Sequence, residues 1–132
     1  MPRLDRNFLN PPLQNLRVGT SLAQLGAVYG LGSVCSFTVE NLGPASAPLN
    51  AFEVHVKFHP QDQQFQTLVS GTNWTQSGPI VAASSGNLAS LGSNSAGFAV
   101  LNIHGAFQLV FYGSTASTNG SSLNINPTFT DT

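Results

Sequence analysis

Strict alternation of apolar and polar residues constrains the fold of this chain more than any other feature. In residues 51–60, "AFEVHVKFHP", every second side chain is apolar and the intervening ones are polar or charged until Pro60 ends the run. Side chains on a strand point to opposite faces in turn, so this pattern predicts a half-buried β-strand. Residues 33–41, "SVCSFTVEN", repeat the pattern. The inward-facing residues predicted to form the core are Phe37, Val39, Phe52, Val54, Val56 and Phe58.

Shorter runs of the same kind continue to the end of the chain, separated by clusters of Gly, Ser, Asn and Pro. They lie at residues 65–71, 78–86, 97–105, 106–114 and 121–129. The run at 97–105 is apolar enough for a strand buried on both faces. Turn residues recur about every ten positions and no helical period competes, which is typical of an all-β, antiparallel sandwich. We place the sandwich domain at residues 31–132.

Residues 1–30 differ in composition and are predicted to form an extended N-terminal arm. Three of the four basic residues lie here, and "NPP" at 10–12 blocks a helix. We expect the arm to rest on a partner subunit, and the sandwich to fold without it. The residues expected to contact the partner are Arg3, Arg6, Phe8, Leu9, Leu13, Leu16 and Arg17.

Charge is scarce: Asp, Glu, Lys and Arg make up 7% of the chain, the net charge is −1, and residues 63–130 contain none of the four. Four basic residues cannot supply the basic surface that nucleic-acid binding requires. A neutral surface docks on other proteins at little desolvation cost, which favours a homo-oligomer or larger assembly. The sequence shows no apolar leader or membrane span, and its single cysteine, Cys35, predicts a cytoplasmic site of synthesis.

Catalytic and metal-binding patterns are weak. On a strand, His55 and His59 would stand roughly 13 Å apart, too far to bind one ion. The acidic candidates Glu40 and Glu53 fall on predicted outward faces, where solvated carboxylates are the usual case. We therefore expect no enzyme activity, no catalytic residue, no metal and no cofactor. Trp74, in "GTNWTQSG", either closes one end of the core or offers a stacking platform for a sugar.

Two segments carry a resemblance to a known class of protein: "FTVENLGPASAPLNAFEVHVKF", in which an Asn-Leu-Gly turn joins two strands, and the hairpin "GFAVLNIHGAFQLVFYGS". They resemble immunoglobulin-like sandwich modules of tailed-bacteriophage virions. The resemblance implies an immunoglobulin-like β-sandwich and a capsid decoration or cement protein, often trimeric, that binds the major capsid protein. Alternatives are a tail, neck or fibre-attachment component and a carbohydrate-binding module. A virion protein of this kind would be made in the host cytoplasm.

Overall fold

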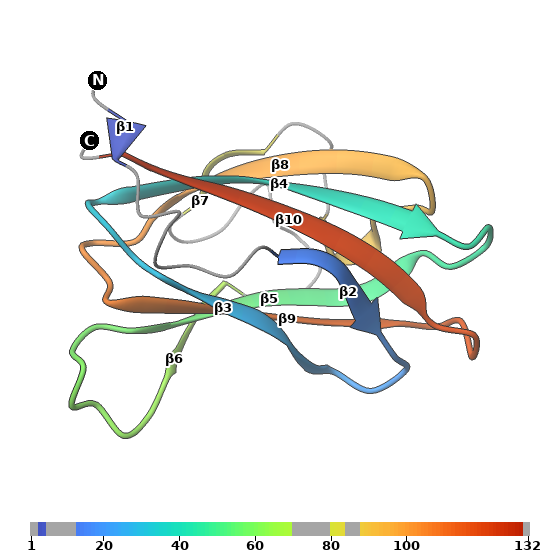
Figure 1. The fold of residues 1–132 in the computed structure, drawn as a ribbon, viewed down its shortest axis with the longest axis horizontal. Coiled ribbons are helices and arrows are strands. Elements are labelled where there is room, and N and C mark those ends of the chain that lie inside the picture. The colour runs from blue at the N-terminus through green and yellow to red at the C-terminus, as the bar shows by residue number, and fades with distance from the viewer. Residues whose placement is uncertain (1–2, 5–12, 70–79, 84–87, 131–132) are drawn as a thin grey trace.

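Two antiparallel sheets pack face to face in a computed structural model that describes residues 3–4, 13–69, 80–83 and 88–130 (Figure 1). The predicted all-β sandwich is thus confirmed. The six-stranded sheet has the order β1-β10-β4-β8-β7, with β2 also paired to β10. Its strands are β1 (Arg3–Leu4), β2 (Leu13–Val18), β4 (Val34–Gly43), β7 (Ile80–Ala83), β8 (Ser95–Asn102) and β10 (Ser121–Thr130).

The four-stranded sheet has the order β3-β9-β5-β6. Its strands are β3 (Ala23–Tyr29), β5 (Leu49–Lys57), β6 (Gln66–Val69) and β9 (Gln108–Thr115). A single turn of 3₁₀ helix, η1 (Leu88–Ser90), precedes β8 and buries Leu88 and Ala89 in the core. Every strand pair in both sheets is antiparallel.

The strand order is nested. If β2, β3, β4, β5, β6, β8, β9 and β10 are counted as first to eighth, the first strand pairs with the eighth, the second with the seventh, the third with the sixth and the fourth with the fifth. This is the arrangement of a jelly roll. An immunoglobulin domain instead pairs its first two strands in one sheet, whereas β2 and β3 lie in different sheets here. The immunoglobulin-like strand order is therefore wrong, because alternation fixes the face of each side chain and leaves its pairing partner open.

The core is built on three phenylalanines whose rings pack together, Phe37 stacked on Phe52 and edge-on to Phe111. Phe37 from β4 lies 5.4 Å from Phe111 of β9 and 6.2 Å from Phe52 of β5, measured between ring centroids. Five of the six predicted core residues are buried: Phe37, Val39, Phe52, Val54 and Val56. The sixth, Phe58, is 45% exposed because β5 ends at Lys57 and the alternation no longer applies in the turn that follows.

Residues 13–30, expected to belong to the arm, are part of both sheets. β2 pairs with β10, and β3 pairs with β9. Leu13 is only 4% exposed and packs close to Gly26, where a Cβ atom would lie 2.7 Å from Leu13 Cδ2. The absence of a side chain at Gly26 thus permits close approach of β2 to β3. Residues 3–4 pair with β10, while Arg6, Phe8 and Leu9 lie outside the described residues.

Removal of residues 1–30 is therefore expected to unfold the domain, contrary to the expectation from sequence. The deletion takes away three strands, β1, β2 and β3, and the buried side chains of Leu13, Val18 and Val28, each worth about 1.5–3 kcal/mol. Their sum, roughly 5–9 kcal/mol, is comparable to the whole stability of a typical domain. Circular dichroism on urea titration checks this, with a chain lacking only residues 1–12 as the control. A cooperative unfolding transition in the chain that lacks residues 1–30 would contradict this prediction.

One buried amide joins four segments at one end of the sandwich. Asn41, 1% exposed at the end of β4, donates from Nδ2 to the carbonyls of Ala47 (3.0 Å) and Leu91 (3.1 Å). Its Oδ1 accepts from the amide of Gly43 (3.1 Å) and from the hydroxyl of Ser121 (2.6 Å). Through these four hydrogen bonds, Asn41 holds the loop at Ala47 and the segment at Leu91 against the start of β10 at Ser121.

Replacement of Asn41 by Ala should lower the free energy of unfolding by about 3 kcal/mol or more. The change leaves several buried polar groups without this partner, each costing about 1–3 kcal/mol. Urea unfolding followed by fluorescence measures the loss, and Asn50→Ala, at an exposed position of β5, is the matched control. Equal midpoints for the two variants would refute a structural role for the Asn41 amide.

Candidate functional site

On the outer face of the four-stranded sheet, a histidine and a glutamate of β5 are joined by a hydrogen bond. His55 Nε2 lies 2.9 Å from Glu53 Oε1, and both side chains are 21% exposed. The His55 ring also packs on Tyr112, with 4.3 Å between centroids. Glu53 and His55 alternate onto the same side of β5, so the pairing follows from the strand period. The sequence placed both residues outward but missed their contact.

The other acidic and histidine candidates lie apart from this pair. His59 and Asp62 belong to the turn after β5, where Asp62 Oδ2 accepts from the His59 amide and His59 Nδ1 accepts from the Gln61 amide. Glu40 lies on β4 in the other sheet. In the part of the chain that the structure describes, no group of three or more His, Cys, Asp or Glu side chains could hold a metal ion.

Cys35 is buried in the core on β4, fully enclosed by its neighbours. Burial disfavours the thiolate and raises the pKa of the Cys35 thiol to about 12. Only the thiolate is nucleophilic, so the native chain presents an inert thiol at this position.

Cys35 should therefore resist a thiol reagent such as dithionitrobenzoate at pH 8 until the chain unfolds. Addition of urea above the unfolding midpoint is expected to expose the thiol and give one equivalent of fast labelling. An Asn119→Cys variant, with a thiol in an exposed turn, is the control for reagent activity. Labelling of native Cys35 as fast as that control would contradict the burial.

The partner-contact residues predicted from sequence differ in exposure where the structure describes them. Leu13 is buried, Leu16 is partly buried against the core, and Arg17 is exposed on β2. Arg3 lies in β1, and Arg6, Phe8 and Leu9 are outside the described residues. Trp74, the predicted sugar platform, is also outside them.

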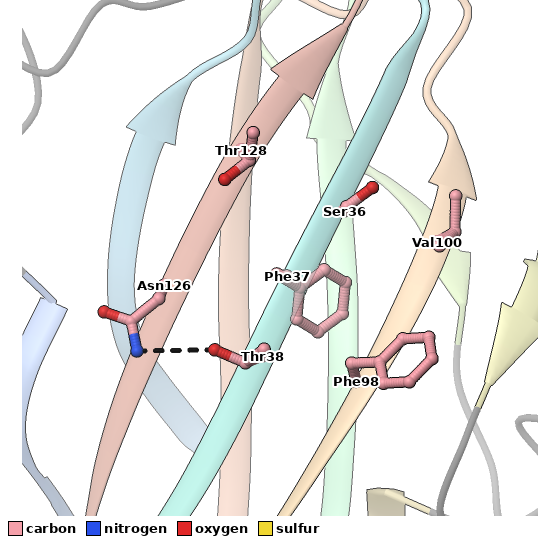
Figure 2. Close-up of a pocket in the computed structure, with 7 residues that line it drawn as sticks. All are labelled: Ser36, Phe37, Thr38, Phe98, Val100, Asn126 and Thr128. Atoms are coloured by element: carbon pink, nitrogen blue, oxygen red, sulfur yellow. Dashed lines mark hydrogen bonds between the residues drawn. The ribbon is translucent and has the colours of Figure 1, made fainter. Parts of the chain in front are cut away.

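A different site lies on the outer face of the six-stranded sheet, across β10, β4 and β8 (Figure 2). Strand pairing places Asn126, Thr38 and Phe98 in one row and Thr128, Ser36 and Val100 in the next. Together they line an open depression of about 270 Å³ whose floor is at Phe37. Phe98 is 39% exposed, so the predicted burial of both faces of this strand is wrong.

The polar and apolar groups of this depression are sorted by strand. β10 contributes an amide and a hydroxyl, β4 contributes two hydroxyls, and β8 contributes Phe98 and Val100 (Figure 2). Asn126 Oδ1 accepts from Gln14 Nε2 at 3.0 Å, and Asn126 Nδ2 donates at 3.4 Å to Thr38 Oγ1 and to Glu40 Oε1. The site can therefore offer an oriented amide, free-turning hydroxyls and one aromatic face to a ligand.

Further apolar side chains are exposed at the two ends of the sandwich. Lys57 Nζ lies 5.6 Å from the centre of the Phe65 ring, and Tyr29 meets Phe107 edge-on with 5.4 Å between centroids. Tyr29 and Lys57 are both paired with Gln108, so these contacts share one end of the sheet. Among the residues that the structure describes, the exposed large hydrophobic side chains are Leu22, Tyr29, Leu42, Phe58, Phe65 and Phe98.

The sequence matches no protein-family model, and searches of curated proteins and of solved structures find no match either. Within the described residues, no helix has the length and apolar character needed to span a membrane.

Proposed function

We propose that this chain is a non-enzymatic structural protein of a bacteriophage particle, a capsid decoration or cement protein that acts through protein–protein contacts. The observation that carries the proposal is the nested strand order, because jelly rolls are the domains of many viral capsids. Lectins and cupins use the same arrangement. The strand order alone therefore does not separate a capsid-associated role from these other functions, and the surface has to support the assignment.

The surface favours contacts with several protein neighbours. It is nearly uncharged, so little charge has to be desolvated when a neighbour docks. Exposed apolar side chains occur at both ends of the sandwich: Leu42 lies near the end of β4, while Tyr29 and Phe65 lie near the opposite end. A standard interface takes about 800 Å² from each partner, and the described part of the chain exposes 6580 Å² in total. One copy therefore has room for several contacts.

The mechanism is additive. Each contact removes apolar area from water at about 25 cal/mol per Å², and many linked copies raise the stability of a shell through multivalency. The partners are copies of the same chain, in a homo-oligomer such as a trimer, and the major capsid protein. A tail, neck or fibre-attachment protein would use the same contacts at another place in the particle.

Purified particles provide the test. An antiserum against the purified chain should detect it in virus particles banded from lysed cultures of the host that carries the gene. For a decoration protein, gel densitometry should give a copy number close to that of the major capsid protein, whereas a neck or tail component should give far fewer copies. Presence in the lysate and absence from every particle fraction would rule out a virion role.

A further inference from the structure

We propose that the depression on the outer face of the six-stranded sheet binds one ring of a neutral sugar, with Phe98 as the stacking surface and Asn126 as the polar anchor. This binding site is independent of the structural role proposed above. It also differs from the sugar platform predicted at Trp74, because it is built from β4, β8 and β10.

The first support is the pairing of an apolar with a polar side. A pyranose ring has a C–H face of slight positive character and a rim of hydroxyls. The negative face of an aromatic ring attracts such C–H groups, and Phe98 is exposed enough to present its face. Thr38 on β4 and Asn126 on β10 lie in the same row as Phe98. Their polar groups can form hydrogen bonds with the hydroxyls of the sugar (Figure 2).

The second support is orientation of the amide before a ligand binds. Gln14 on β2 donates to Asn126 Oδ1 at 3.0 Å, which directs Asn126 Nδ2 toward β4. Both bonds that Nδ2 makes are long, at 3.4 Å to Thr38 and Glu40. A ligand oxygen can improve on bonds of that length, and a pre-positioned donor loses little conformational freedom on binding.

Charge and size then select the class of ligand. The seven lining residues carry no charge, and the nearest carboxylate, Glu40, disfavours an anion. Neighbouring strands are about 4.8 Å apart, so the three strands span about 10 Å, which suits one ring with its substituents. The volume of about 270 Å³ lies near the lower end of the range of about 300–1,000 Å³ that small-molecule sites occupy.

The test is a nuclear magnetic resonance titration of the ¹⁵N-labelled full chain with neutral oligosaccharides of glucose, mannose, galactose, xylose and N-acetylglucosamine. At least one series should shift the amide signals of residues 36–38, 98–100 and 126–128 together. Phe98→Ala should weaken that binding about 10-fold, and Asn126→Ala should weaken it several-fold. Phe58→Ala, which removes an equally exposed phenylalanine from the turn after β5, should leave it unchanged. The dispersion of each spectrum confirms that each variant is folded.

Three outcomes would overturn the sugar site. The first is that none of the five series shifts these amide signals at tens of millimolar sugar. The second is that the shifts fall on other residues. The third is that Phe98→Ala and Phe58→Ala have the same effect on sugar affinity. If Phe98→Ala changes the mass of the protein in solution without any sugar response, the face is a protein interface instead. Detection of the chain in virus particles does not depend on any of these results, so the two proposals can fail separately.

Discussion

The Asn41 amide is the contact that fixes how the chain passes between its two sheets. It bonds the connection from β4 to β5 at Ala47, the segment after η1 at Leu91 and the first residue of β10 at Ser121. These segments belong to loops and strand ends, where backbone groups lack ladder partners and have to be satisfied in another way. A buried side chain with two donors and two acceptor positions can meet several of them at once. The ends of β4, β5 and β10 are thereby held in the register that packs Phe37 against Phe52 and Phe111.

The nested strand order has a direct consequence for the outer faces. In the six-stranded sheet, β4 pairs with β8 and β10, which are distant from it in sequence, so one row of the outer face collects residues from positions 38, 98 and 126. The inward residues of the same strands are aliphatic or aromatic and form the core. The outward residues can therefore vary without loss of the fold. In this chain they form a polar column on β10, a hydroxyl column on β4 and an apolar column on β8.

Alternation predicted much of the fold and little of the site. It located β4 and β5 and five of six core residues, because these strands have one buried and one solvated face. It misjudged residues 13–29, where glycines and a positive φ of 55° at Asn15 interrupt the pattern while the Asn15 amide bonds Asn124 Oδ1. It also misjudged β8, whose exposed face holds Phe98 and therefore looks like a core strand. The depression depends on pairing among three strands, and a period of two contains no information about pairing.

The absence of charged residues from positions 63–130 can be understood from the same faces. This run includes β8, β9 and β10, which supply the buried side chains of both sheets as well as part of their surface. Buried positions exclude charge because an unpaired ion is costly there. Exposed positions have no such restriction, yet uncharged Asn126 and Phe98 occupy two of them. Solubility alone would favour Asp, Glu or Lys at these positions. Uncharged side chains at these positions suit a surface that contacts an uncharged partner, either another protein or a sugar, as proposed above.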